Sequence, residues 1–192
     1  LLEVETSGSG HNCLLFGCLL SAGLLHRSAQ DDVRPLVERQ RHMLTADLLE
    51  RLPAEGARAP DAWHANWDAT RARRVGRNAT SFLGEAHIHV IANRLRCSIV
   101  VCDQLERGPL LYARMMCYEP GWKAQREIYK EEACALRRQM AGASRSRPVL
   151  WLRLRPGHFT ALLSREQVAI PRAAIAGDAA ALDIFGRASD GP

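Results

Sequence analysis

Near its N-terminus the chain reads Gly8-Ser9-Gly10-His11-Asn12-Cys13-Leu14-Leu15-Phe16, a polar turn with two glycines that leads directly into an apolar run. This pattern predicts a helix over residues 13–25 that begins at Cys13. The dipole of such a helix and the unpaired N–H groups of its first turn favour a thiolate, which makes Cys13 a candidate nucleophile. The glycines allow the turn to direct N–H groups at an oxyanion. The candidate oxyanion residues are Ser9, Gly10, His11 and Asn12.

A second informative stretch lies near the other end of the chain, where the turn Arg155-Pro156-Gly157 precedes His158. Strand-like runs at residues 149–154 and 159–163 flank this turn, and together they predict a β-hairpin. A histidine at the start of the second strand can serve as general base for a thiol if the fold brings that strand beside the helix start. The combination of Cys13 with His158 therefore indicates a cysteine protease or isopeptidase.

The spacing of apolar residues predicts the remaining elements of the fold. Some segments have apolar residues at helical spacing. Between them lie short runs that are rich in β-branched residues or in which apolar and polar residues alternate, and such runs are typical of strands. Expected helices cover residues 30–52 (in two pieces) and 82–95, and residues 122–141 are expected to form a helix or a partly ordered insertion. Expected strands cover residues 1–7, 97–102 and 109–118. Together with the hairpin, these elements predict an α+β protein.

The composition is that of one globular domain. The chain has 192 residues, of which 47% are hydrophobic, and this is enough to bury a sizeable core. No apolar stretch approaches the roughly 20 residues needed to cross a bilayer, so no membrane span is expected. We expect a monomer with a single domain over residues 1–192, in which the alanine-rich residues 165–192 form a partly frayed extension.

The cysteines and the charges argue against several other kinds of site. The six cysteines lack C-x-x-C spacing and most lie in apolar runs, so we expect free thiols in a reducing, intracellular environment. His87-Ile88-His89 is too small a ligand set for zinc, and we expect no metal and no cofactor. The net charge of +5 comes mostly from dispersed arginines without interleaved aromatic residues, so nucleic-acid binding is not expected.

Three stretches of this sequence, in the same order along the chain, resemble the ovarian tumour (OTU) family of cysteine proteases. Gly10-His11-Asn12-Cys13-Leu14-Leu15-Phe16 is similar to the nucleophile motif of that family, Asp-Gly-Asn-Cys-Leu-Phe. Phe82-Leu83-Gly84-Glu85-Ala86, with the helix and strand that follow, is similar to its middle segment. Pro156-Gly157-His158-Phe159-Thr160-Ala161-Leu162 resembles its closing His-Tyr-x-x-Leu element. The resemblance implies a papain-like OTU fold, with a small mixed or antiparallel central sheet, helices around it and the nucleophile at a helix start.

The third catalytic group is left open by the resemblance. Two residues after the histidine, where the family has an acid or an amide, this chain has Thr160, whose hydroxyl can accept a hydrogen bond but supplies no anion. The aspartate of the family's nucleophile motif is replaced as well, by Ser9-Gly10-His11. Some members place an acid on a strand before the nucleophile, where Glu3 and Glu5 would lie on one strand face. We therefore expect either a Cys–His dyad assisted by Thr160 or a triad completed by one of these glutamates.

The resemblance implies a deubiquitinase that would hydrolyse the isopeptide bond after the ubiquitin C-terminus through a thioester. Its partners would be ubiquitin or polyubiquitin chains. The arginine- and alanine-rich composition suggests a GC-rich bacterium, and such an enzyme would then be an effector secreted into a host cytoplasm. Two alternatives stay open. One is a papain-like cysteine protease or toxin domain that does not act on ubiquitin, and the other is a catalytically silent ubiquitin-binding module.

Overall fold

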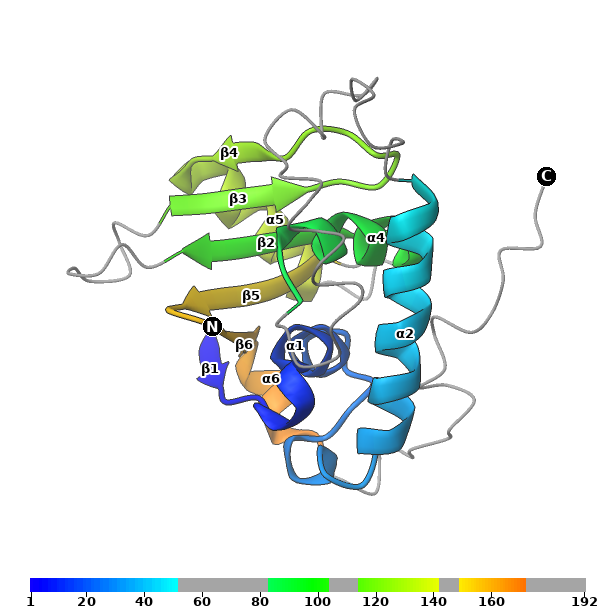
Figure 1. Cartoon of the computed structure of the whole chain (residues 1–192). Helices are drawn as coiled ribbons and strands as arrows, with labels where there is room; N and C mark the ends of the chain where they lie inside the picture. The colour runs from blue at the N-terminus through cyan, green and yellow to red at the C-terminus, as the bar shows by residue number, and fades with distance from the viewer. Residues whose placement is uncertain (52–82, 104–113, 142–148, 172–192) are drawn as a thin grey trace.

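A six-stranded mixed sheet forms the centre of the protein in a computed structural model that describes residues 1–51, 83–103, 114–141 and 149–171 (Figure 1). The strands lie in the order β1-β6-β5-β2-β3-β4. Their bounds are Leu2–Val4 (β1), Ser98–Asp103 (β2), Arg114–Tyr118 (β3), Arg126–Ile128 (β4), Val149–Arg155 (β5) and His158–Leu163 (β6). The β2–β5 pair is parallel and the other four pairs are antiparallel. The predicted α+β class with a small mixed sheet is confirmed.

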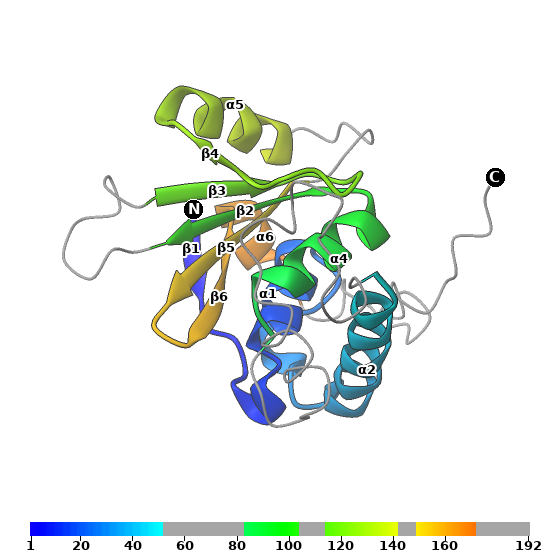
Figure 2. The same ribbon diagram turned by 45° about the horizontal axis from the view of Figure 1, so that its top comes forward.

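Helices cover both faces of this sheet. Within the described ranges they are Cys13–Ser21 (α1), Arg34–Arg51 (α2), Glu85–Leu95 (α4), Lys130–Ala141 (α5) and Arg165–Ala169 (α6), with 3-10 turns at Ser9–His11 and Arg27–Ala29. Figure 2 shows α1, α2 and α4 on one side of the sheet and α5 on the other. Two hydrophobic clusters correspond to these two faces, because alternate residues of β2 and β5 point in opposite directions.

Helix α1 is buried along its whole length. All nine of its residues are buried, and this is why its sequence is apolar on every side and not only on one. It packs on β5 and β6, where a methyl group added at Gly17 would come within 3.0 Å of Leu152 Cδ2. The lack of a side chain at Gly17 therefore lets the helix backbone approach the sheet closely.

Several element boundaries differ from the sequence prediction. The N-terminal strand is shorter than residues 1–7, α1 ends at Ser21, and residues 34–51 form one helix, not two pieces. The expected helix over residues 122–141 is wrong for its first part, because α5 begins only at Lys130 and Arg126–Ile128 forms strand β4. This three-residue edge strand lacks apolar alternation, and only its pairing with β3 defines it. Three predictions lie partly outside the described residues. These are the start of the 82–95 helix at residue 82, the first part of the 109–118 strand and most of the C-terminal extension. No described helix is long and apolar enough to span a bilayer.

Candidate active site

The turn before α1 presents Cys13 at the first position of the helix, as predicted. Gly10 and His11 both have left-handed backbone angles, with φ of 65° and 59°, and these reverse the chain just before Asn12. Cys13 is only 1% exposed. Burial raises the pKa of the Cys13 thiol, and hydrogen bonds from backbone N–H groups and the positive charge of Arg41 offset this only in part. The helix start alone therefore does not produce the expected thiolate, and the sulfur needs a base.

Arg41 holds this turn from the neighbouring helix α2. Its Nη1 donates hydrogen bonds to the carbonyl of His11 at 3.1 Å, to the carbonyl of Gly10 at 3.4 Å and to Asn12 Oδ1 at 3.2 Å. In a trans peptide the C=O and N–H groups point in opposite directions. By binding the carbonyl of His11, Arg41 therefore turns the N–H of Asn12 to the other side of the turn, where an oxyanion could be bound.

Sequence reasoning missed Arg41, although the sequence contains a signal. Only 4% of Arg41 is exposed, and it shares the buried face of α2 with Val37, Leu44 and Leu48. A charged residue at a position that the helical period assigns to the core needs buried partners. Here those partners are the carbonyl groups of the nucleophile turn.

His158 begins β6, directly after the turn that contains Gly157, as the hairpin pattern predicted. The next residue brings β6 to the nucleophile, because the N–H of Phe159 donates to Cys13 Sγ at 3.5 Å. Across the described residues, the imidazole of His158 has two side-chain neighbours at its Nε2 atom. These are Thr6 Oγ1 at 3.2 Å and Glu5 Oε2 at 3.7 Å. The backbone of the residue after His158 thus lies against the predicted thiol, and the imidazole of His158 lies beside Thr6 and Glu5.

The arrangement of sheet and helices is similar to that of a solved deubiquitinase. The crystal structure of an OTU deubiquitinase from Wolbachia pipientis wMel bound to ubiquitin matches this chain with a TM-score of 0.52 at 8% sequence identity. The match covers 86% of this chain and 96% of that chain. The fold is OTU-like. No protein-family model matches the sequence, and no curated protein matches it either.

Within this OTU-like fold, Glu3 and Thr160 contact each other and not the imidazole. The hydroxyl of Thr160 donates to Glu3 Oε1 at 2.7 Å, and Glu3 also forms ion pairs with Arg153 and with Arg155. Burial raises the pKa of Glu3, but the hydrogen bonds from Thr160 and Arg155 and the charge of Arg153 outweigh it, so the pKa is lowered. Glu3 is therefore an ionised carboxylate with its own partners.

Glu5 is the candidate carboxylate that lies beside His158. It is 64% exposed, and its Oε1 atom also forms an ion pair with Arg155 at 2.9 Å. Solvent and the arginine both weaken its effect on the imidazole. Thr6, which the sequence analysis did not consider, lies closer to the ring and is buried. Its place in the strand-like pattern of residues 1–7 gave no indication of this contact.

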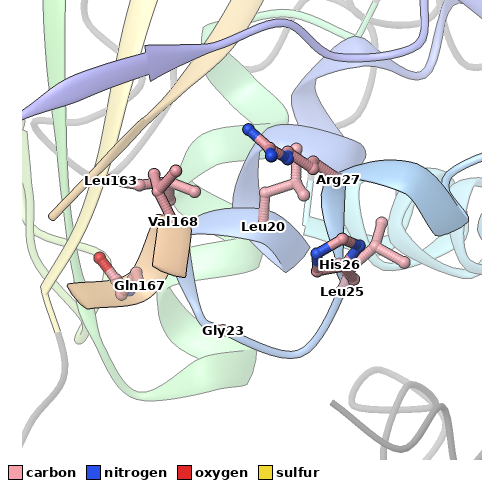
Figure 3. Close-up of a pocket in the computed structure, with 8 residues that line it drawn as sticks. All are labelled: Leu20, Gly23, Leu25, His26, Arg27, Leu163, Gln167 and Val168. Carbon is pink, nitrogen blue, oxygen red and sulfur yellow. The ribbon is translucent and has the colours of Figure 1, made fainter. Parts of the chain in front are cut away.

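A small hollow in the surface lies at the other end of α1 from Cys13 (Figure 3). Leu20, Gly23 and Leu25 line it from the helix end, and Gln167 and Val168 of α6 close it. Its cavity volume is about 10 Å³, room for a single water molecule at most. The hollow is therefore too small and too far along the helix to take part in chemistry at Cys13.

The described residues contain no group of three or more His, Cys, Asp or Glu side chains that could hold a metal ion. All six cysteines are free, and Cys134 is the exposed one among them.

His87 makes the stability of the protein depend on pH. It is buried near Arg41, and its Nδ1 accepts a hydrogen bond from the N–H of Gly84 at 3.2 Å. Burial and the charge of Arg41 lower the pKa of His87 to about 4. The unfolded chain, with a histidine pKa near 6.5, binds the proton more readily. Stability should therefore fall as the pH decreases from about 6.5 to 4, by about 3 kcal/mol in total.

Urea unfolding of the wild type and of His87→Gln between pH 7 and pH 4 measures this contribution. The variant should lose less stability over that range than the wild type does. His42→Gln, at an exposed position on α2, is the control and should follow the wild type. Equal pH dependence in the wild type and His87→Gln would show that His87 is not the responsible group.

Proposed function

We propose that the chain is a cysteine deubiquitinase that cleaves the isopeptide bond after the ubiquitin C-terminus. The observation that carries this proposal is the hydrogen bond between the backbone of β6, next to His158, and the Cys13 thiol at a helix start, within an OTU-like fold. The Wolbachia protein of similar fold was solved bound to ubiquitin, which supports ubiquitin or polyubiquitin as the partner.

The proposed reaction gives one role to each of the two residues. His158 takes the proton of Cys13, and the sulfur attacks the carbonyl carbon of the scissile bond. The carbonyl oxygen becomes an oxyanion, which the N–H groups of Cys13 and of Ser9, Gly10 and Asn12 in the turn stabilise. The N–H of His11, also a predicted donor, donates instead to the carbonyl of Gly8 at 3.1 Å. Collapse breaks the C–N bond, and the imidazolium gives its proton to the leaving lysine amine. Water then attacks the thioester as His158 takes its proton, and this releases the ubiquitin carboxylate and the thiol.

The free cysteines support activity in a reducing, intracellular environment, since a nucleophilic thiol must stay reduced there. We place the enzyme in a host cytoplasm, delivered by a bacterium, on the basis of the arginine- and alanine-rich composition alone. Glu5 stays a candidate for direct assistance to the Cys–His pair, whereas the hydroxyl of Thr160 donates to Glu3.

A ubiquitin probe with a C-terminal electrophile tests the proposal. The protein should form a one-to-one adduct, visible by intact mass, and peptide mapping should place it on Cys13. The exposed thiol of Cys134 provides an internal control, because non-specific alkylation would reach it first. No adduct from the folded protein would contradict the proposal and favour a thiol enzyme with another substrate. Ubiquitin binding without an adduct would indicate a silent binding module.

A further inference from the structure

Thr6 occupies a defined position beside the nucleophile and the base. Strand β1 pairs with β6 so that Val4 lies opposite Ala161, and continuing this antiparallel register places Thr6 opposite Phe159. Thr6 is 7% exposed, and its methyl group faces α1, 3.7 Å from the position that a Cβ would take on Gly17. Packing on the helix and the hydrogen bond to the carbonyl of Phe159 in β6 therefore hold the side chain from two sides.

The hydroxyl of Thr6 has one proton, and the structure shows where it goes. The hydroxyl donates to the carbonyl oxygen of Phe159, which can only accept. The remaining contact of Thr6 Oγ1, with His158 Nε2 at 3.2 Å, must then have the imidazole as donor. A neutral imidazole carries one N–H. With that proton on Nε2, the lone pair is on Nδ1.

This assignment matters because a general base must offer a lone pair to the thiol proton, and with the proton on Nε2 only Nδ1 can offer one. Phe159 connects the two halves of the arrangement. Its N–H donates to Cys13 Sγ and its carbonyl accepts from Thr6, so the thiol and the hydroxyl are held by one residue adjacent to His158. The charged groups near the ring are Glu5 at 3.7 Å and, through Glu5, Arg155, and both are more exposed than Thr6.

We infer that Thr6 is a positioning residue that holds His158 in the tautomer with the proton on Nε2, in the role that an acid or an amide fills in Cys–His–Asp or Cys–His–Asn sites. The inference rests on the proposed function as far as ubiquitin hydrolysis is concerned, while the tautomer and the thiol reactivity do not depend on the substrate. A hydroxyl fixed by a backbone carbonyl selects the tautomer as a carboxylate does, but it adds no charge to stabilise the imidazolium.

Three variants test this inference. Thr6→Val keeps the shape and removes the hydroxyl, Thr6→Ser keeps the hydroxyl, and Thr45→Val is the matched control, since Thr45 on α2 is also 7% exposed. Nitrogen-15 NMR of the His158 ring in the neutral state should show the Nε2–H form in the wild type, in Thr6→Ser and in Thr45→Val. In Thr6→Val both tautomers should be populated.

Rates give the second measurement. Thr6→Val should lower kcat for a ubiquitin C-terminal amide by about tenfold to a hundredfold with little change in KM, because the loss is in the orientation of the base. Alkylation of Cys13 by iodoacetamide at neutral pH should slow in the same variant. Thr6→Ser should restore both rates to within a few-fold of the wild type, and Thr45→Val should leave them unchanged.

The outcomes separate this inference from the proposed function. A wild type that does not hydrolyse the ubiquitin amide would contradict the function, while the NMR and alkylation results would still decide the role of Thr6. A folded Thr6→Val that keeps the Nε2–H tautomer and the wild-type alkylation rate would overturn the inference even if the enzyme cleaves ubiquitin.

Discussion

Replacement of Cys13 by alanine should abolish hydrolysis of a ubiquitin C-terminal amide. The sulfur of Cys13 is the atom that would carry the acyl group, and no described side chain beside it could serve as nucleophile in its place. The expected loss in kcat is on the order of 10⁴-fold or more, since removal of a nucleophile leaves only binding and oxyanion stabilisation. Steady-state hydrolysis with a fluorogenic ubiquitin amide measures it. The fold should survive, because the change removes a single buried sulfur atom.

Cys18→Ala is the matched control for this experiment. Cys18 lies on the same helix as Cys13, is fully buried, and has a pKa raised well above the usual range by burial, so it should not be a nucleophile. Its replacement should lower stability by about 1 kcal/mol and leave the rate near that of the wild type. Residual activity in Cys13→Ala, or loss of activity in a folded Cys18→Ala, would remove Cys13 from the mechanism.

Replacement of Arg41 by methionine should affect both stability and rate. Methionine can fill the space of the arginine stem but leaves the carbonyl groups of Gly10 and His11 and Asn12 Oδ1 without their donor. Leaving these buried acceptors without their charged donor should lower the free energy of unfolding by about 3 kcal/mol in total. A turn that is no longer held would also present its N–H groups poorly to the oxyanion, and we expect kcat to fall by about 10²- to 10³-fold.

Thermal unfolding and kcat measured well below the unfolding temperature separate the two effects of Arg41→Met. Arg39→Met is the matched control, because Arg39 is an exposed arginine on the same helix, and it should change neither quantity. Arg41→Lys keeps the charge, but its shorter side chain places the ammonium group away from the position of Nη1, so it should recover part of the stability and less of the rate. Wild-type values of both quantities in Arg41→Met would show that the turn does not depend on this arginine.

The local features of the site could be predicted from the sequence, and its long-range contacts could not. The glycine turn before Cys13 and the turn before His158 are encoded in a few consecutive residues, and both were found where expected. The contact of Thr6 with His158 depends on the register between β1 and β6, which joins opposite ends of the chain. No local pattern contains that register, so a threonine in a short strand could not be recognised as a neighbour of the base.

The acidic residues show the same limit. Alternation predicted that Glu3 and Glu5 lie on one strand face, and both carboxylates do bind Arg155. Which of them lies beside His158 depends on how far β1 extends along β6, and this is set by the packing of the two strands. Thr160 and Arg153 bind Glu3, and these contacts could likewise be identified only once β5, β6 and β1 were placed side by side.

The pairing of β1 with β6 also sets when the site can exist during synthesis. The Thr6–His158 contact spans 152 residues and the Phe159–Cys13 contact spans 146, so both close only when nearly the whole described fold is in place. Contacts of such high sequence separation form late in folding, because the entropy of loop closure must be paid first. A nascent chain therefore carries the thiol of Cys13 without its histidine until residue 158 has been made, so under the proposed function a chain made only to that point could not yet cleave the proteins around it.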